Sequence, residues 1–169
     1  MRALNLKFTH MIGPILNTHH AKILQMNTQF VHWLSPMDAS ALDYILQRAD
    51  YQRQINDGAG ILLGYSDMVD YPDHKNLTWL RGVLKNFFYI DRVIINDGAH
   101  RQGLGAALYA DVEHYARSGG YDHLACEVNT RPNNPASHAF HLDMGFRPIG
   151  DVEYPDYDAA LRYYGKSLT

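Results

Sequence analysis

Hydrophobic and polar residues alternate along parts of the chain, and other parts are short, densely hydrophobic runs. Both patterns are typical of β-strands. By these criteria strands are predicted over residues 4–11, 51–55, 59–65, 87–96, 123–129, 146–154 and 160–168. The dense run at 87–96 favours a central position in a sheet. Asn56-Asp57-Gly58 predicts a tight hairpin turn between the second and third strands, since Asp-Gly tolerates positive φ angles.

Hydrophobic residues spaced by three and four positions indicate amphipathic helices. Such helices are predicted from Thr18 to Leu34, from Asp38 or Ser40 to Ala49, from Gly103 to Ser118, and from Pro135 to about Gly145. The residues at their starts are candidate N-caps, because their side-chain oxygens accept backbone N–H bonds: Thr18, Asp38 or Ser40, and Asn134. Residues 67–86 follow neither period, and we interpret them as a flap beside the substrate or as a variable surface loop. The order of elements predicts an α/β domain with a mixed sheet.

The composition narrows the class of protein. A hydrophobic content of 46% in 169 residues fits one folded domain and argues against disorder. The net charge of −3 disfavours nucleic-acid binding through phosphate neutralisation, and no apolar run approaches the roughly 20 residues of a membrane span. No signal peptide is evident, and the lone Cys126 excludes an internal disulfide. We therefore expect a soluble cytoplasmic protein with neither a nucleic-acid partner nor a membrane segment.

Ten histidines stand against fifteen lysines and arginines, a proportion that raises the question of a metal site. His138 and His141 have the i, i+3 spacing that brings two imidazoles onto one helix face. The sequence offers no third ligand near them, and a single cysteine excludes a zinc site built from several thiolates. No metal site is predicted.

A glycine-punctuated turn joins the central strand to the next helix, in the segment Ile94-Ile95-Asn96-Asp97-Gly98-Ala99-His100-Arg101-Gln102-Gly103-Leu104-Gly105-Ala106. The first turn of a helix has free N–H groups at the positive end of its dipole, so this segment is a candidate phosphate or pyrophosphate site. A dinucleotide fingerprint is excluded because a third glycine is missing at Ala107 or Leu108, and a P-loop is excluded because Gly-Lys-Ser/Thr is absent. A turn that merely begins a helix remains the alternative.

A second motif lies at the next strand and helix, where Glu127-Val128-Asn129 is followed by N-P-A-S-H-A-F-H-L-D-M-G-F at residues 134–146. Together the two motifs resemble R/Q-x-x-G-x-G/A and N-x-x-A/S-x-x-x-Y-x-x-x-G-F of the GNAT superfamily of acetyl-CoA-dependent N-acetyltransferases. Tyr89-Ile90-Asp91-Arg92 and Cys126-Glu127-Val128-Asn129 are similar to a bacterial branch of it. The resemblance implies the GNAT acyl-CoA N-acyltransferase fold over residues 1–169, with a central mixed β-sheet of about seven strands flanked by about four helices.

The resemblance also implies a site for acetyl-CoA as co-substrate. The strand at 87–96 and the strand with Val128 would part to admit the pantetheine arm, and the N–H of Ile95 would polarise the thioester carbonyl. Backbone amides at 101–106 would hold the pyrophosphate, with His100 in place of the usual Arg or Gln. Asn134 would contact the arm or simply cap its helix. The residues expected to bind acetyl-CoA are Ile94, Ile95, Asn96, His100, Arg101, Gln102, Gly103, Leu104, Gly105, Ala106 and Asn134.

His141 stands where the family usually has the tyrosine that protonates the leaving thiolate. An imidazole with a pKa near 6.5 is partly protonated at neutral pH, so His141 is the candidate acid; a base, or a polar residue near the sulfur, are the alternatives. Candidates for the base are Tyr89, Asp91 and Glu127, and a chain of waters would also serve. A buried carboxylate often pairs instead with an arginine such as Arg92. Cys126 is interpreted as a core residue rather than a nucleophile.

The predicted function is acetyl transfer from acetyl-CoA to a primary amine, of a small molecule, by direct attack in a ternary complex. A non-catalytic module that senses acetyl-CoA is the alternative, since the usual tyrosine is replaced by His141. Residues 33–38 and 65–79 are expected to frame the acceptor site, and their aromatic and Asp residues favour a cationic amine. Dimers are common in the superfamily, which leaves a homodimer open.

Overall fold

The computed structural model describes residues 10–169. The helices are α1 (His20–Gln29), α2 (Ala39–Leu46), α3 (Lys75–Val83), α4 (Leu104–Ser118) and α5 (Pro135–Asp143). The strands are β1 (Ile12–Pro14), β2 (Tyr51–Ile55), β3 (Gly60–Ser66), β4 (Phe87–Ile95), β5 (His123–Arg131), β6 (Arg147–Tyr154) and β7 (Ala159–Ser167). Three short 3-10 helices are η1 (Asn17–His19), η2 (Asp97–Ala99) and η3 (Pro155–Tyr157). The strand predicted at 4–11 lies almost entirely outside the described residues.

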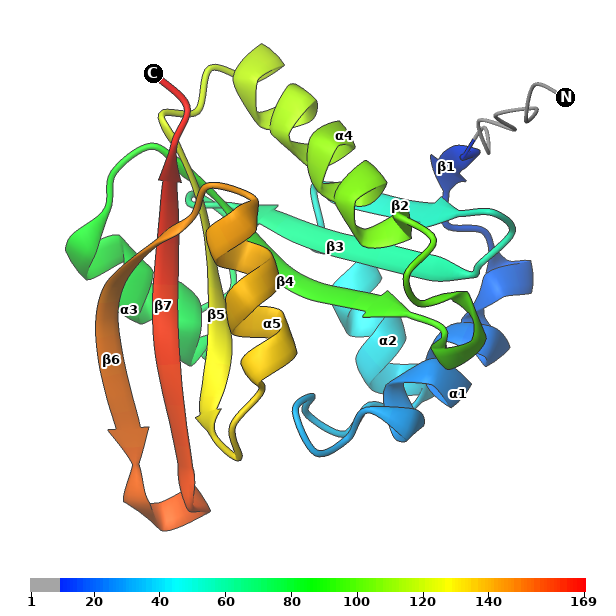
Figure 1. The fold of residues 1–169 in the computed structure, drawn as a ribbon, viewed down its shortest axis with the longest axis horizontal. Coiled ribbons are helices and arrows are strands. Elements are labelled where there is room, and N and C mark those ends of the chain that lie inside the picture. The colour runs from blue at the N-terminus through cyan, green and yellow to red at the C-terminus, as the bar shows by residue number, and fades with distance from the viewer. Residues whose placement is uncertain (1–9) are drawn as a thin grey trace, which may run out of the picture.

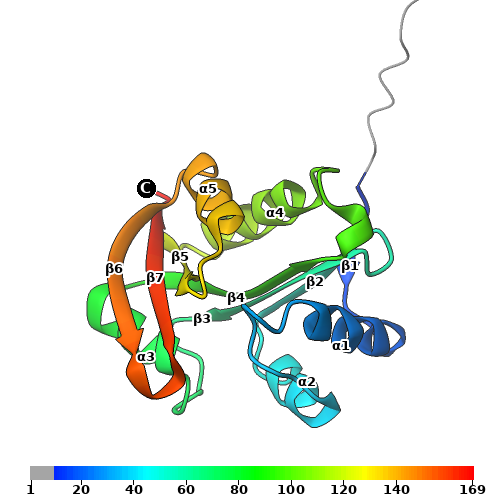
Figure 2. The ribbon, with the colours of Figure 1, turned by 60° about the horizontal axis from the view of Figure 1, so that its bottom comes forward.

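The seven described strands form one sheet in the order β1-β2-β3-β4-β5-β7-β6 (Figure 1). Neighbours are antiparallel except β4 and β5, which are parallel. The predicted mixed sheet, with the strand at 87–96 in its centre, is therefore confirmed. Helices α4 and α5 cover one face, and α1, α2 and α3 cover the other (Figure 2).

Each face of the sheet has its own hydrophobic core. Leu104 and Leu108 of α4 pack with Phe88 of β4 in one core. In the other core, Leu42 of α2 packs together with Leu77 of α3. Buried apolar surface of this kind is the main favourable contribution to folding. The inward-facing positions of α4 follow its helical spacing, as the sequence indicates.

The N-terminal helix differs from its prediction at both ends. Thr18 lies inside η1 rather than at the N-cap, and the N-cap of α1 is His19, whose side chain makes no capping bond. The helix ends at Gln29 rather than near Leu34. Asn27 donates its side-chain N–H to the carbonyl of Ser35 at 3.0 Å, which holds the following turn against the helix. Sequence spacing alone does not show this tertiary bond.

Two other predicted signals are confirmed. Asp38 is the N-cap of α2, and its Oδ1 accepts the N–H of Ala41 at 2.8 Å. In the hairpin between β2 and β3, Asn56, Asp57 and Gly58 have φ angles of 50°, 54° and 76°. These left-handed values are the ones that the Asn-Asp-Gly sequence predicts.

The interpretation of residues 67–86 as a flap or loop is wrong for residues 75–83, which form α3. The helix begins after His74, whose Nδ1 accepts the N–H of Leu77 at 3.4 Å. Leu77 and Leu80 of this helix are fully buried. Histidine is not among the usual N-caps, so the start signal was missed. Residues 10–169 thus contain five α-helices rather than about four.

Within residues 10–169 no helix is long and apolar enough to cross a bilayer.

Candidate active site

The central feature of the sheet is the separation of β4 and β5. The two strands are paired only from Phe87 opposite His123 to Tyr89 opposite Ala125. Beyond that point β4 continues to Ile95 and β5 to Arg131 without pairing each other (Figure 1). The separation expected from the resemblance is therefore confirmed. It leaves two strand edges whose backbone groups need other partners.

A β-bulge in β4 sets the direction of the side chains beside this opening. Leu63 of β3 is opposite Arg92, and Gly64 is opposite Ile90, so Asp91 is an extra residue in β4. An extra residue interrupts the alternation of side chains between the two faces of a sheet. Tyr89, Asp91 and Arg92 consequently all reach the face covered by α1, α2 and α3.

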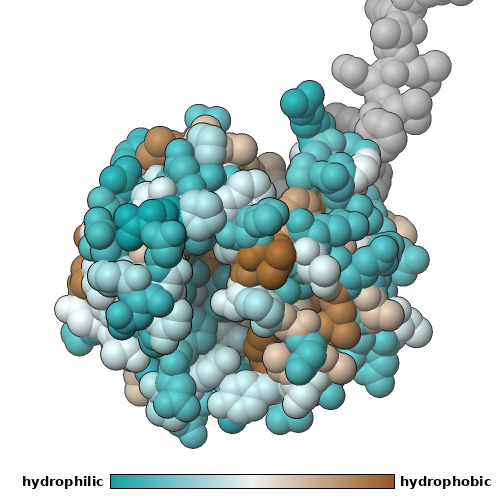
Figure 3. Space-filling view, turned by 90° about the horizontal axis from the view of Figure 1, so that it is seen from below, coloured by the Kyte–Doolittle hydropathy of each residue, from teal (hydrophilic) through white to brown (hydrophobic). Residues whose placement is uncertain are grey.

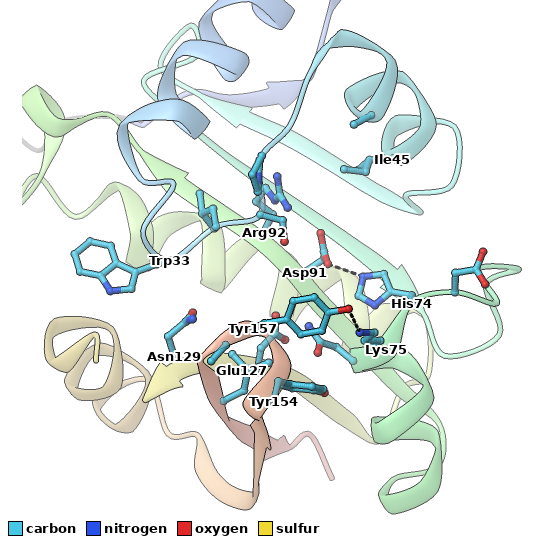
Figure 4. A pocket seen from close by; sticks show the side chains of 18 of the residues that line it. Trp33, Ile45, His74, Lys75, Asp91, Arg92, Glu127, Asn129, Tyr154 and Tyr157 are labelled. Carbon is cyan, nitrogen blue, oxygen red and sulfur yellow. Dashed lines mark hydrogen bonds and ion pairs between the residues drawn. The ribbon is translucent and has the colours of Figure 1, made fainter. Parts of the chain in front are cut away.

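Asp91 and Arg92 line a cavity of about 1030 Å³, and the Tyr89 hydroxyl is hydrogen-bonded to Asp91. The cavity opens on the face seen in Figure 3, between the loop after α1, the start of α3 and the hairpin of β6 and β7 (Figures 3 and 4). Trp33 and Asp38 line it from the first predicted acceptor segment, and Tyr71 and His74 line it from the second. Glu127 lines it from β5.

A chain of polar contacts crosses the cavity floor. His74 Nε2 lies 2.8 Å from Asp91 Oδ1, and its Nδ1 is occupied by the N–H of Leu77, so Nε2 donates to the carboxylate. The Tyr89 hydroxyl lies 3.2 Å from Asp91 Oδ1 and 3.0 Å from Glu127 Oε1. Asn76 of α3 donates to the Tyr89 oxygen at 3.2 Å. The missed helix α3 therefore brings two residues of this cluster to the floor.

The two carboxyl groups of the cluster have different pKa values. Burial would raise the pKa of Asp91, but the hydrogen bond and charge of His74, then Arg92 and Tyr89, outweigh burial and lower it. Burial, followed by the negative charge of Asp91, raises the pKa of Glu127 to about 8. Glu127 is thus mostly protonated at neutral pH and ionises just above it. A group poised in this range can act as a general base.

Glu127 also has an uncommitted oxygen. Its Oε2 is buried and has no hydrogen-bond partner in the described part of the chain. A buried polar atom without a partner is costly and is often explained by a missing ligand.

Asp91 pairs with His74, so the expected pairing of a carboxylate with Arg92 is wrong. Arg92 Nη1 instead donates to Asn27 Oδ1 at 2.8 Å.

The loop before α4 has the backbone of an anion site. Arg101 and Gly103 have left-handed φ angles of 62° and 78°. Between residues 10 and 169 nothing accepts the N–H groups of Leu104, Gly105 and Ala106. Three free donors at the positive end of a fifteen-residue helix suit a pyrophosphate. The residues present therefore fit the group that the resemblance implies.

The end of β4 directs one peptide group toward the opening. The N–H of Asn96 donates to Ala59, on the side of β3, at 2.8 Å. Because successive residues of a strand direct their backbone groups to opposite sides, the N–H and C=O of Ile95 face the opening. His100 Nε2 lies 2.9 Å from that carbonyl, and its ring stacks on Phe30. His100 thus contacts the end of the strand with its side chain.

Other residues of the predicted acetyl-CoA site lie along the same edge. Ile94 is buried in the core beside α1, and Gln102 Nε2 donates to Gly98 at 3.4 Å. Asn134 is the N-cap of α5, since its Oδ1 accepts the N–H of Ser137 at 3.2 Å. Its capping role is confirmed, and its contact with the pantetheine arm stays a prediction.

His141 is buried on the opposite face of the sheet, with 3% of its surface exposed. Its Nδ1 lies 2.7 Å from the carbonyl of Ser137, so Nδ1 carries the proton. Its Nε2 lies 2.7 Å from the Tyr109 hydroxyl and accepts from it. Burial lowers the pKa of His141. Tyr109, which sequence reasoning missed, has no motif of its own; only the folded structure places it against His141.

Cys126 is buried, and burial raises the pKa of its thiol well above the ordinary value. The interpretation of Cys126 as a core residue is confirmed. Both ring nitrogens of His138 are hydrogen-bonded within the protein, one to the Tyr164 hydroxyl and the other to the carbonyl of Asn129. In the described range, no three His, Cys, Asp or Glu side chains are placed to hold a metal ion.

The GNAT acetyltransferase family model matches residues 26–146, which is more than half of the chain. The chain belongs to this family. It is therefore an acyltransferase, of a family that uses acetyl-CoA. A search of curated proteins gives no match.

Solved structures show the same fold at low sequence identity. Ard1 from Thermoplasma volcanium has a TM-score of 0.75 and 12% identity, over 95% of this chain and 98% of that one. The ribosomal-protein-S18-alanine N-acetyltransferase from Escherichia coli has a TM-score of 0.67 and 13% identity, over 95% of each chain. YncA, a putative acetyltransferase from Salmonella typhimurium with its cofactor acetyl-CoA, has a TM-score of 0.66 and 14% identity, over 95% of each chain. The predicted GNAT fold is confirmed.

Proposed function

We propose that the protein transfers an acetyl group from acetyl-CoA to a primary amine of a small molecule, by direct attack in a ternary complex. One observation carries this proposal. The unpartnered Oε2 of Glu127 lies at the floor of the cavity, beside the point where β4 and β5 separate. An amine that enters the cavity would meet a carboxyl group able to take its proton.

Acetyl-CoA binding would use the opening and the loop already described. The pantetheine arm would lie between β4 and β5 along Ile94, Ile95 and Asn96, beside Asn134. The pyrophosphate would rest on the amides of residues 101–106, the loop that begins at His100. The free N–H groups at the start of α4 support this placement. The N–H of Ile95, which faces the opening, would then polarise the thioester carbonyl.

Transfer requires the amine to lose a proton, since an alkylamine has a pKa of about 10.4 and is charged at neutral pH. Ionised Glu127 would accept that proton at Oε2, and Tyr89 would hold Oε1 in place. The amine nitrogen would attack the thioester carbon, and the oxyanion would be stabilised by the N–H of Ile95. The nitrogen of the intermediate still carries one proton too many and releases it to solvent. Collapse then re-forms the carbonyl, breaks the C–S bond, and yields the amide and the thiolate of CoA.

We retain His141 as the candidate that protonates this thiolate. Both of its nitrogens are engaged, so Nε2 would first have to take up a proton and release the hydroxyl of Tyr109. The lowered pKa of His141 opposes that step. A CoA thiol with a pKa of about 8.5 also leaves readily as the thiolate, which lowers the demand on any acid. Turnover rates of His141 variants therefore decide whether His141 protonates the thiolate.

Two side-chain bridges at the cavity support a small acceptor. Trp33 Nε1 donates to the carbonyl of Asn133 at 3.3 Å, joining the loop after α1 to the loop before α5. Lys75 Nζ donates to the Tyr157 hydroxyl at 3.4 Å, joining α3 to the hairpin of β6 and β7. Side chains across the entrance favour a free small molecule over the surface of a folded macromolecule. The lone Cys126, which forms no disulfide, fits the cytoplasmic location that we propose.

The test is the release of CoA thiol from acetyl-CoA in the presence of a panel of primary amines, with the acetylated product identified by mass. Thiol release that depends on the amine and on the intact chain is expected. Tight binding of acetyl-CoA without release for any amine would favour the alternative, a module that senses acetyl-CoA.

A further inference from the structure

Arg92 is a buried cation at the cavity that the proposed chemistry does not use. It follows the bulge residue Asp91 in β4, lines the cavity, and has 8% of its surface exposed. Figure 4 shows Arg92 and Glu127 on two sides of the cavity, reached from β4 and β5 respectively. The cavity therefore has a carboxyl side and a guanidinium side.

The guanidinium of Arg92 has few partners. Its Nη1 donates to Asn27 Oδ1 at 2.8 Å and approaches Met37 Sδ at 3.3 Å. Its Nε is buried without an acceptor, and no carboxylate among residues 10–169 lies within 4.0 Å of it. A guanidinium has five N–H donors, and here only one oxygen receives any of them. A buried arginine in this state is strongly under-satisfied.

The neighbouring carboxyl groups do not neutralise it directly. Asp91 is bonded to His74 and Tyr89, at 2.8 Å and 3.2 Å. Glu127 keeps its proton at neutral pH, since its pKa is about 8. Arginine prefers carboxylate partners, whose planar oxygens match its N–H groups. Among residues 10–169, Arg92 is thus left without an anionic partner.

We infer that the acceptor is an amino carboxylate, whose carboxylate binds Arg92 while its amine faces Oε2 of Glu127. This inference rests on the proposed function and names its substrate class. The carboxylate of such an acceptor meets the opposite charge of Arg92, and its amine meets the carboxyl group of Glu127, which takes up a proton from it once Glu127 is ionised. A purely cationic amine, which the aromatic and Asp residues of the sequence favour, leaves Arg92 unpaired.

Matched pairs of acceptors test the inference. Each L-amino acid is compared with its carboxamide, which keeps the side chain and the amine but removes the negative charge. The wild-type protein is expected to show kcat/KM about tenfold or more higher for the acids, because a site built for a polar group rejects the analogue that lacks it. Equal or better transfer to the amides would overturn the inference and leave the proposed function intact.

Variants of Arg92 test whether this residue causes the preference for amino acids over their carboxamides. Arg92→Met is expected to abolish the preference for acids over amides while leaving the Kd for acetyl-CoA unchanged. Arg92→Lys keeps the charge and is expected to retain part of the preference, which also guards against a fold that does not tolerate methionine. Arg162→Met, at an exposed arginine paired with Asp151, is the control and should keep the full preference. An equal loss of transfer to acids and amides in both Arg92 variants would overturn the assignment.

Failure of the inference is distinguishable from failure of the proposed function. If no amine of either kind is acetylated, the proposed function fails. If amines without a carboxylate are acetylated and amino acids are not, only the inference fails.

Discussion

The Tyr89 hydroxyl lies 3.0 Å from Glu127 Oε1 and joins β4 to β5 where the strands begin to separate. It also lies 3.2 Å from Asp91 Oδ1, and it has only one proton to donate. Asp91, whose pKa is lowered, is the stronger acceptor of that proton. Glu127 Oε1 is the second acceptor in reach of the same hydroxyl. The contact thus couples the charge of Glu127 to the charge of Asp91.

Glu127→Gln is predicted to lower kcat/KM by about 10²- to 10⁴-fold, the usual contribution of a positioned base. Wild-type kcat/KM should rise with pH up to about 8, as Glu127 ionises. The variant requires an amine that is already neutral, so its rate should rise only toward the pKa of the amine, about 10.4. Initial rates of thiol release across this pH range measure both effects.

The control for this experiment is Glu153→Gln, which changes an exposed carboxylate 3.7 Å from Arg131. It should keep the wild-type rate and pH profile. A profile that rises near pH 8 in Glu127→Gln as well would show that another group is the base.

The stability of the protein should also report on Glu127. Its folded pKa of about 8 lies above the ordinary value of 4.5, so between these pH values the folded state holds a proton that the unfolded state has released. The free energy of unfolding therefore falls as pH rises through this window, by on the order of 1 kcal/mol or more. Denaturant unfolding at both ends of the window should show Glu127→Gln gaining stability relative to wild type at high pH. Parallel curves would contradict the raised pKa.

Asp91→Asn is predicted to move the rising limb of the pH profile to lower pH. The charge of Asp91 is the second cause, after burial, of the raised pKa of Glu127. Removing it lowers that pKa and leaves the part due to burial. Asp43→Asn, at an exposed position on α2, is the control and should leave the limb in place. A limb that stays near pH 8 in Asp91→Asn would show that Asp91 does not act on the base.

Gly103→Ala is predicted to weaken acetyl-CoA binding and to cost about 1–2 kcal/mol of stability, because Gly103 has a φ of 78°. Gly82→Ala is a matched control in α3, where an added methyl meets nothing within 4 Å. It should leave binding unchanged and stabilise the helix by up to about 1 kcal/mol. Gly103→Glu, which adds a negative charge at the phosphate site, should abolish binding in calorimetry. Unchanged affinity in that variant would refute the site.

Strong local signals account for the parts of the fold that the sequence predicts well. The spacing of Leu104, Leu108 and Val112 defines α4, and Asn134 with Pro135 marks the start of α5. Each of these helices has its own start signal and hydrophobic face in the sequence, so local interactions are enough to predict where it forms. The residues that we propose to bind acetyl-CoA lie at the starts of these two helices, which is why that loop could be predicted from the sequence.

The acceptor side depends on features without a local signal. Helix α3 is capped by His74 and supplies His74 and Asn76 to the cavity floor. The bulge at Asp91 exists only in the pairing of β4 with β3, and it turns Arg92 toward Asn27. Both features arise from tertiary contacts, which the sequence pattern does not show. For this reason the sequence predicts a carboxylate paired with Arg92, whereas in the structure Asp91 pairs with His74.

The hydrogen bond of 2.7 Å from the Tyr109 hydroxyl to His141 Nε2 gives the candidate acid a separate test. His141→Phe removes the acceptor of a buried hydroxyl, so it should destabilise the protein by about 1–3 kcal/mol. Combining it with Tyr109→Phe should recover part of that loss, because both polar partners are then replaced together.

Kinetics separate the acid role from this structural one. If His141 protonates the thiolate, kcat should fall by about 10²-fold or more in His141→Phe. In Tyr109→Phe, kcat should stay unchanged or rise, because Nε2 of His141 then has no hydrogen bond from Tyr109 and is free to take up a proton. Rates of thiol release are compared at temperatures where each variant is folded. An unchanged kcat in His141→Phe would remove the acid role and leave the pair as a structural link between α4 and α5.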